Sequence, residues 1–492
     1  MKSSVKSFIA AMSTILMVAV SCNKELAETT DSNLEKHTCE MKLVGSLVNF
    51  DEPATRAGAN ATTWADGSVI YLRMASPLGY TTGEAVYNAT KNVWTISYYG
   101  SLYEGVSNTC TALYLEDKVS YENSLFTLDE GTVIYEDLEG SYIFEEGDLV
   151  VTANLKPKTG RIRFKGTAGS VLKVYGVTHY DTYDIGTDIY TVTTEPFKLT
   201  VGSDGYTPYF YGYFTNEDEP NVKVWIDAKE AYTRFCSKDI FNAGQSGKMT
   251  IPTADSHNGW VDGLYFNVKG AQFKLVAVEG GTFTMGNPES LSQEYTAHKV
   301  TLTGYCIGET EITTLLYYKM MTTSNTNQPN LAVTMGRGTI ASLLEKLNTL
   351  ENVGFDFPTE AQWEFAAKGG VKSQGYIYSG SDNIDEVAWY KSNSGSIKDV
   401  KLKKPNELGI YDMTGNVQEY VKDFYSAYPD AAQIDPYIPY SGTGNRVYLL
   451  RGGYSQASSD YCTNVYRRTY NYDSYSSSSP TDAGGRIALN WN

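Results

Sequence analysis

A run of 29 residues near the C-terminus, Tyr454–Asp482, cannot supply a hydrophobic core of its own. It contains 6 Tyr, 8 Ser, 2 Asn and 3 Asp, and Val465 is its only branched aliphatic residue. Apolar, strand-like sequences flank it, RVYLLRGG (Arg446–Gly453) and GGRIAL (Gly484–Leu489). A serine-rich disordered tail is the alternative interpretation, but such a tail has no reason to return to a strand. We therefore predict a surface segment held at both ends by a folded scaffold.

The residue types in this segment are typical of a binding surface. Tyrosine gives a large amphipathic contact area with few rotatable bonds, while serine and asparagine give adaptable hydrogen bonds. We predict noncovalent binding of a protein or glycan on a host or bacterial surface. One of Arg467 and Arg468 is expected to fix the segment to the scaffold. The predicted ligand-binding residues are Tyr454, Ser455, Ser458, Asp460, Tyr461, Asn464, Tyr466, Tyr470, Asn471, Tyr472, Asp473, Ser474, Tyr475 and Ser476.

Tyr, Ser, Asn, Asp, Thr and Cys are all reached from an AAC or AAT codon by changing its adenines. In composition, placement and flanking anchors, the segment resembles the variable proteins of diversity-generating retroelements. The resemblance implies that residues 454–482 lie on a C-type-lectin-like scaffold and are rewritten at template adenines. It also implies that the ligand differs between variants.

Length, charge and cysteine usage limit the classes of protein. With 492 residues the chain is expected to form three or four domains. A net charge of −17 argues against nucleic acid or an anionic membrane surface as partner. The six cysteines show no CxxC spacing and there are only four histidines, so a zinc site or a dense disulfide framework is not expected.

The N-terminus carries a targeting signal. Lys2 and Lys6 precede an apolar run, Phe8–Val20, which is too short for a mature membrane-spanning helix. The run ends in AVSC, which resembles a bacterial lipobox and implies a signal peptide (1–21), lipidation of Cys22, and a tether (22–39). The chain would then be an outer-membrane or cell-surface lipoprotein that meets the membrane only through its lipid. An ordinary secretory signal with an incidental cysteine is the alternative.

Two consecutive all-β sandwich domains are predicted over residues 40–155 and 156–251, because β-rich runs such as SVIYLRMA and VLKVYGV alternate with turn residues. FDEPATRAG, TTWADGSVIYL and KPKTGRIRF resemble the fimbrillin family of type V pilus subunits. The resemblance implies proteolytic cleavage after Arg56, which removes a strand and lets another pilus subunit donate one. An ordinary loop arginine is the alternative. Because another domain follows, the chain would accept a strand but not donate one, as expected at a pilus tip.

A polar linker (252–263) leads into a mixed α+β domain, residues 264–492, which we call the head. Helices are expected over 314–321, 340–350 and 360–368, capped by Thr313, Thr339 and Thr359. GGTFTMG, HKVTLTGYCIGETEIT, FPTEAQWEFAAKGG, KPNELGIYDMTGNVQEY, LRGG and GGRIAL together resemble the formylglycine-generating enzyme (sulfatase-modifying factor) superfamily. The resemblance implies a variant of the C-type-lectin fold.

The active enzymes of that superfamily bind copper through two cysteines five residues apart. The second corresponds to Cys462, but the first corresponds to Ala457. Tyr454 stands where the superfamily has a serine after the GG pair, and Gln418 stands where it has the tryptophan of the motif GNVWEW. We therefore predict no formylglycine-generating activity and no copper, with Cys462 as a vestige of the catalytic pair.

A structural calcium ion is the other cofactor that the resemblance implies. Its ligands would be the Asp412 and Glu419 carboxylates and the Gly415 and Val417 carbonyls, hard oxygen donors that suit calcium. The alternative is that the two acidic residues form capping and salt-bridge interactions without a metal.

The sequence thus predicts a cell-surface adhesin at a pilus tip, with two fimbrillin-like β-domains and a C-type-lectin-like head. Two alternatives stay open. One is a formylglycine-generating oxidase or a relative, and the other is a structural pilin or surface lipoprotein with a fixed head.

Overall fold

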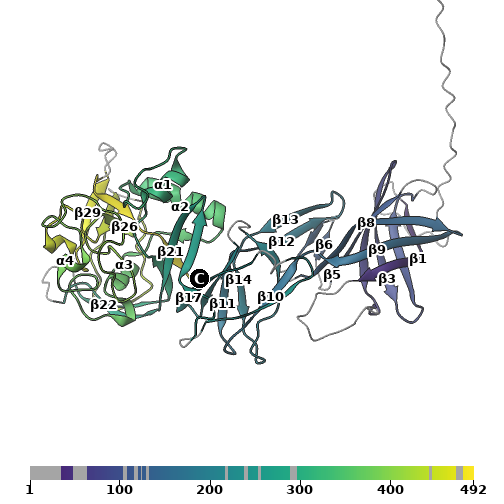
Figure 1. The fold of residues 1–492 in the computed structure, drawn as a ribbon, viewed down its shortest axis with the longest axis horizontal. Helices are drawn as coiled ribbons and strands as arrows, with labels where there is room; N and C mark the ends of the chain where they lie inside the picture. The colour runs from purple at the N-terminus through teal and green to yellow at the C-terminus, as the bar shows by residue number, and fades with distance from the viewer. Residues whose placement is uncertain are drawn as a thin grey trace, which may run out of the picture.

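The computed structural model describes residues 35–47, 64–102, 108–115, 120–122, 125–128, 132–215, 220–237, 242–252, 256–288, 296–442, 446–472 and 480–491. Three folded parts follow one another along the long axis of the molecule (Figure 1). Within the described residues, no helix has the length and apolarity needed to cross a membrane. The predictions for Cys22, Arg56, Asp473, Ser474, Tyr475 and Ser476 lie outside the described residues.

The first part is a closed barrel, where the sequence predicted a sandwich. β2 shows the alternation behind the prediction of strands, because it buries Ile70, Leu72 and Met74 and leaves the residues between them less buried. The strand order is β1-β4-β3-β2-β5-β8-β9. The strands are β1 (Lys36–Leu47), β2 (Val69–Ser76), β3 (Gly79–Asn88), β4 (Val93–Tyr99), β5 (Thr109–Leu115), β8 (Ile134–Glu145) and β9 (Asp148–Pro157).

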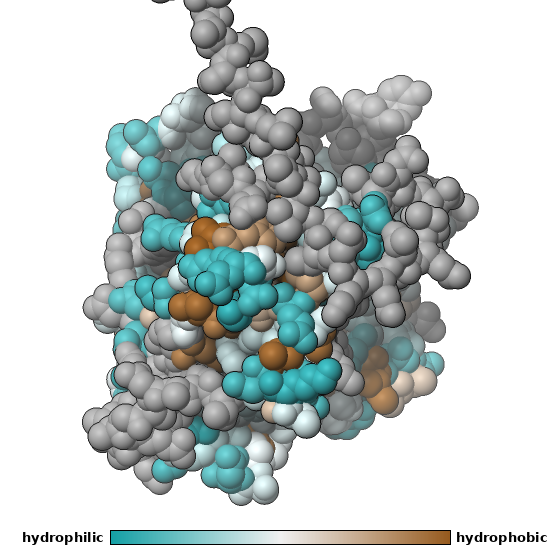
Figure 2. Space-filling model, turned by 90° about the vertical axis from the view of Figure 1, so that its right-hand side faces the viewer, coloured by the Kyte–Doolittle hydropathy of each residue, from teal (hydrophilic) through white to brown (hydrophobic). Residues whose placement is uncertain are grey.

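The first strand, β1, closes the barrel because it pairs on both sides. It runs antiparallel to β4 and parallel to β9, so that Met41 lies opposite Trp94 on one side and Leu149 on the other. Because β1 begins at Lys36, the residues from Lys36 to Cys39 belong to a strand and not to the predicted tether. Seen from the barrel end, hydrophobic residues of the described surface lie between hydrophilic ones (Figure 2).

The second part consists of two sheets, one ordered β18-β10-β15-β12-β7-β6 with β13 beside β12, and one ordered β14-β11-β16-β17-β19. The strands are β6 (Ser120–Glu122), β7 (Leu125–Thr127), β10 (Gly160–Lys165), β11 (Val171–Tyr175), β12 (Val177–Asp184), β13 (Ile189–Thr193), β14 (Phe197–Thr200), β15 (Phe210–Phe214), β16 (Asn221–Ile226), β17 (Glu230–Phe235), β18 (Ser246–Thr250) and β19 (Val261–Asp262).

Both predicted boundaries of this second part need correction. The hairpin β6–β7 comes from the sequence of the first domain, yet β7 pairs with β12, so one sheet spans the boundary predicted at residue 155. At the other end, Trp260 lies in the core of the second domain and Val261–Asp262 pair with β17. The predicted linker (252–263) is therefore partly built into this domain.

The head contains three small sheets, ordered β20-β21-β24-β31-β25, β22-β23-β27 and β29-β28-β26-β30. The strands are β20 (Leu264–Val268), β21 (Ala271–Val278), β22 (Gly281–Met285), β23 (His298–Leu302), β24 (Tyr305–Gly308), β25 (Phe355–Asp356), β26 (Gln418–Phe424), β27 (Gln433–Ile434), β28 (Arg446–Arg451), β29 (Arg468–Tyr472), β30 (Ala483–Gly485) and β31 (Ala488–Asn490). Both predicted anchors of the tyrosine-rich segment are strands here, β28 upstream and β30 with β31 downstream.

The helices of the head are α1 (Thr314–Met321), α2 (Arg337–Glu351), α3 (Glu360–Ala367) and α4 (Ile384–Val387). The capping box of Thr359 and Gln362 is confirmed at the start of α3, and Thr313 caps α1. The predicted cap Thr339 is wrong, because α2 begins three residues earlier, after Gly336. Helix α3 is buried along its whole length, which places its charged residues in the interior of the head.

The head shares a core with the second β-domain. The indole rings of Trp225 (β16) and Trp491 meet edge to face at 4.8 Å, and Lys173 Nζ donates a hydrogen bond to Trp491 O at 2.9 Å. Gly304 lies so close to the turn after β16 that a Cβ at this position would stand 1.8 Å from Ala228 O. The two parts therefore meet through backbone as well as side chains.

Candidate ligand-binding face

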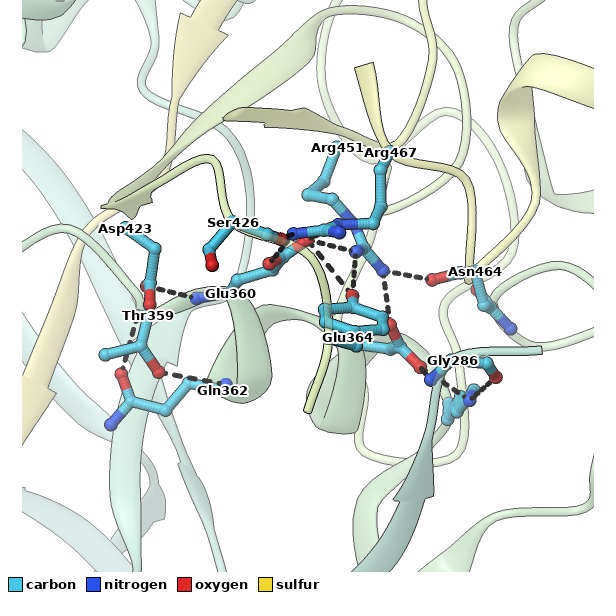
Figure 3. Close-up of polar contacts among 12 residues, drawn as sticks. Gly286, Thr359, Glu360, Gln362, Glu364, Asp423, Ser426, Arg451, Asn464 and Arg467 are labelled. Atoms are coloured by element: carbon cyan, nitrogen blue, oxygen red, sulfur yellow. Dashed lines mark hydrogen bonds and ion pairs between the residues drawn. The ribbon is translucent and has the colours of Figure 1, made fainter. Parts of the chain in front are cut away.

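A buried ion network lies beneath the tyrosine-rich segment (Figure 3). Arg451, at the end of β28, is completely buried and contacts two carboxylates one turn apart on α3. Its Nη1 is 2.7 Å from Glu360 Oε1, and its Nη2 is 2.6 Å from Glu364 Oε2. Because these charges are removed from water, each requires its partner. The network therefore fixes β28 to α3.

The same network fixes the segment itself. Arg451 Nη2 donates to Asn464 O at 2.7 Å, and Arg467 Nε donates to Glu360 Oε1 at 2.7 Å. The Arg467 guanidinium also lies 3.9 Å from the centre of the Tyr428 ring. Arg467 is thus the scaffold arginine, whereas Arg468 is half-exposed and pairs with Asp482 at 3.1 Å.

The ion pairs of Glu364 make the free energy of unfolding of the head depend on pH. Burial alone would raise the pKa of Glu364, but Lys368 and Arg451 hold it at about 2, below the ordinary value of 4.5. As the pH falls, the unfolded chain takes up this proton first, so the stabilisation is complete above about pH 4.5 and is lost towards pH 2. The difference corresponds to about 3 kcal/mol.

We expect Glu364→Gln to lower the free energy of unfolding by about 3 kcal/mol at pH 7 and by much less at pH 3. Urea unfolding of both proteins at the two pH values measures this. Glu386→Gln is the matched control, because Glu386 pairs with Lys404 at the surface, where water screens the pair and its loss should leave the stability nearly unchanged. An equal effect of Glu364→Gln at both pH values would contradict the prediction.

Above the network, side chains of the segment form an exposed surface that we call the tyrosine face. Tyr461 is 49% exposed, and its ring packs 5.0 Å from that of Tyr466. Arg468 lies 5.2 Å from the centre of the Tyr454 ring. We define this face by eight exposed or half-exposed residues, Tyr454, Gln456, Ser458, Asp460, Tyr461, Tyr466, Thr469 and Asn471. Gln456 and Thr469 were missed, because the prediction selected Tyr, Ser, Asn and Asp only.

Ser455 and Asn464 do not belong to this face, which corrects the prediction. They are only 3% and 2% exposed. Ser455 N donates to Asn416 O, and Asn464 donates from N to Ile377 O and from Nδ2 to Tyr376 O. Both residues therefore hold the segment against neighbouring loops. Their polar side chains resemble those of the face in type, so composition could not separate them.

The strand β29 carries the next part of the segment and pairs with β28. Thr469 and Asn471 are exposed, whereas Tyr470 between them is half-buried and packs against the core of the head. This alternation is the ordinary consequence of a strand. Tyr470 thus contributes mainly to packing, and the backbone of Tyr472 pairs with Arg446.

Cys462 lies in a buried cluster with Ala388, Tyr390 and Ala457. Burial raises the pKa of its thiol to about 11, so the thiol stays protonated at neutral pH, and Sγ contacts Ser458 O at 3.6 Å. A copper site of the superfamily type needs two thiolates. With alanine at the first position and a protonated thiol at the second, these residues do not fit that ion.

The predicted calcium ligands lie around another buried ion pair. Arg486 donates to both carboxylate oxygens of Glu419, and Trp363 Nε1 donates to Glu419 Oε2 at 2.8 Å. Asp412 Oδ2 accepts from Lys401 N at 2.8 Å, and burial raises the Asp412 pKa to about 6. The salt bridge accounts for Glu419 without a metal. Calcium stays a prediction, which the effect of EGTA on the melting temperature tests.

Residues 330–491 match the family model described as "Sulfatase-modifying factor enzyme 1-like domain", so the head carries a domain of this type. "Chaperone protein LppX" of Paenibacillus barcinonensis is 46% identical over 91 residues, 15% of this chain and 32% of the relative. "Formylglycine-generating enzyme" of Streptomyces coelicolor is 29% identical over 153 residues, 28% of this chain and 46% of the relative. The chain thus spans 32% and 46% of the length of these two relatives.

Two solved structures are also similar. "Treponema denticola variable protein 1" has a TM-score of 0.41 at 26% identity, covering 46% of this chain and 98% of its own. A fimbrial protein from Bacteroides ovatus has a TM-score of 0.25 at 11% identity, covering 92% of this chain and 99% of its own.

Proposed function

We propose that this chain is a cell-surface adhesin whose tyrosine face binds a protein or glycan on a host or bacterial surface. The observation that carries the proposal is the division of the segment into two layers. Buried Arg467 and Asn464 fix its backbone, while Tyr461 and its neighbours are presented to solvent. A rigid backbone lowers the entropy cost of binding, and exposed aromatic residues supply most of the energy.

Substitution of the face tests this function. We expect Tyr461→Ala with Tyr466→Ala to reduce adhesion of beads carrying the full chain at least about thirtyfold, because even one aromatic anchor contributes about 2 kcal/mol. Adhesion is measured on a panel of bacterial and epithelial surfaces. Tyr437→Ala is the matched control, since Tyr437 is 44% exposed but lies beside Gly304 and Trp491, at the junction with the second β-domain. Unchanged adhesion of a folded double variant would favour the structural pilin with a fixed head.

We further propose that a retroelement diversifies the segment. The two layers support a sharper expectation than composition alone. Differences among sister clones should fall at exposed positions such as Gln456, Asp460 and Tyr461, and at adenines of a near-identical template. The buried positions Ala457 and Arg467 should not differ. Sequencing codons 446–492 in related isolates measures this, and equal variation in segment and scaffold would refute it.

The enzyme alternative is supported only by the family of the head and the retained Cys462. The raised pKa of the Cys462 thiol and the alanine at position 457 support our proposal that formylglycine-generating activity is lost. This is tested by incubating the purified chain with copper and a cysteine-containing sulfatase peptide. Aldehyde formation that disappears in Cys462→Ser would overturn the proposal of a noncatalytic head.

We propose that the chain is exported as a lipoprotein with its lipid on Cys22, and that cleavage after Arg56 later releases it from this anchor for placement at a pilus tip. The barrel supports the proposed placement in a pilus. Arg56 follows β1 in sequence, so cleavage there would allow β1 to leave its neighbours β4 and β9. Those two edges would then accept a strand from another subunit. We expect Arg56→Ala to abolish cleavage, as measured by N-terminal sequencing, and to reduce incorporation into pili at least about tenfold. Regular occurrence along pilus shafts would contradict placement at the tip.

A further inference from the structure

A cavity of about 210 Å³ lies between the second β-domain and the head. Strands β11 and β16 form one wall, and β20 with the end of α2 forms the other. It has the volume of about seven water molecules, enough for a small organic molecule. The residues that decide its chemistry are Tyr175, Lys223, Phe266 and Glu351.

Two hydrogen-bond donors line this cavity without a partner among the described residues. Lys223 is 4% exposed, and its Nζ has no hydrogen bond or ion pair there, only the Phe266 ring with its centre at 4.8 Å. Tyr175 is 2% exposed, and its hydroxyl likewise has no hydrogen-bond partner among the residues described. The two residues are direct neighbours across β11 and β16, so their side chains share one face of the sheet.

This arrangement is costly in the absence of a ligand. A buried ammonium needs a counter-charge, and a buried hydroxyl needs an acceptor. Burial accordingly lowers the pKa of Lys223 to about 8. A carboxylate placed between Nζ and the Tyr175 hydroxyl would accept hydrogen bonds from both.

The wall contributed by the head carries one acidic and one basic residue, the half-buried Glu351 and the exposed Lys269. Glu351, the last residue of α2, interacts electrostatically with Lys223, but no ion pair within 4.0 Å joins them across the cavity. Burial raises the pKa of Glu351, and Lys223 lowers it. A simple anion would be repelled by this carboxylate, whereas a ligand with a carboxylate and an ammonium group would satisfy both walls.

We propose that this cavity binds a small zwitterion of the α-amino acid class. The ligand carboxylate contacts Lys223 and Tyr175, and its ammonium group contacts Glu351. Because the two walls belong to different domains, the bound molecule joins the head to the second β-domain. Ligand binding here is separate from the tyrosine face and does not depend on the function proposed for it.

Calorimetric titration and thermal unfolding of the full chain test the proposal, with glycine, L-alanine and L-serine as probes and acetate and methylamine as half-probes. We expect at least one amino acid to bind and to raise the melting temperature. Lys223→Met should abolish the effect, and Glu351→Gln should weaken binding at least about tenfold. Lys229→Met is the matched control, since Lys229 pairs with Glu279 outside the cavity. Absence of binding by all three amino acids, or acetate binding as tightly as glycine, would overturn the zwitterion assignment.

The unliganded variant gives an independent readout. Removal of an unpaired buried ammonium relieves its desolvation cost, so Lys223→Met without ligand should melt at a higher temperature than the native chain. If this variant melts several degrees lower, the ammonium has a partner within the protein and the proposed site is wrong.

Discussion

Arg451→Met is expected to lower the free energy of unfolding of the head by about 3–5 kcal/mol, the usual cost of breaking a buried ion pair. Glu360 would retain Arg467 and Glu364 would retain Lys368, but each carboxylate loses a contact of 2.7 Å or less. Asn464 O also loses its donor. Since domains have stabilities of about 5–15 kcal/mol, this one change removes a large share. Urea unfolding followed by circular dichroism measures it.

Arg468→Met provides the comparison at the neighbouring arginine. Arg468 is half-exposed and pairs with Asp482, so its loss should cost about 1 kcal/mol or less. If the two variants were equally stable, the network would not hold the segment.

Gly304→Ala should separate the head from the second β-domain. The added Cβ would meet Ala228 O at 1.8 Å and Ala228 C at 2.9 Å, and both are backbone atoms that no rotamer change can move. We estimate the cost at about 3 kcal/mol, the upper end for overpacking. Trp225 and Trp491 would lose their contact, so tryptophan fluorescence should shift to the red and the radius of gyration should increase.

Gly338→Ala is the matched control for this junction. A Cβ at Gly338 meets no atom within 4 Å, and alanine in a helix is favoured over glycine by about 1 kcal/mol. This variant should keep the native fluorescence and melt no lower than the native chain. Native fluorescence and scattering in Gly304→Ala would show that the two parts do not meet as described.

Local signals in the sequence were sufficient for part of the fold. The capping box at Thr359 and Gln362 predicted α3 because both partners lie within one turn. The start of α2 was misplaced because Gly336 precedes it with no side-chain cap. The pairing of β7 with β12, and the closure of the barrel by β1, depend on partners distant in sequence, which alternation of residues does not specify.

The sequence predicted where the candidate site lies in the chain, but not which of its side chains are buried and which are exposed. The anchors and the tyrosine-rich composition located the segment, and the pair of arginines was recognised. Which arginine is buried follows from Glu360 on α3, far away in the chain. The i, i+4 spacing of Glu360 and Glu364 on a helix with many apolar residues was the available signal for buried cations. Ser455 and Asn464 could not be distinguished from exposed residues without the loops that cover them.

The hairpin β6–β7 has a consequence for how such a chain can evolve. Its sequence belongs to the first domain, but β7 forms part of the second domain's sheet. Recombination between related genes at residue 155 would therefore join a sheet to a hairpin it did not evolve with. The two β-domains are expected to be inherited as one block. Exchange of one β-domain without the other should therefore cost the stability of the sheet that they share.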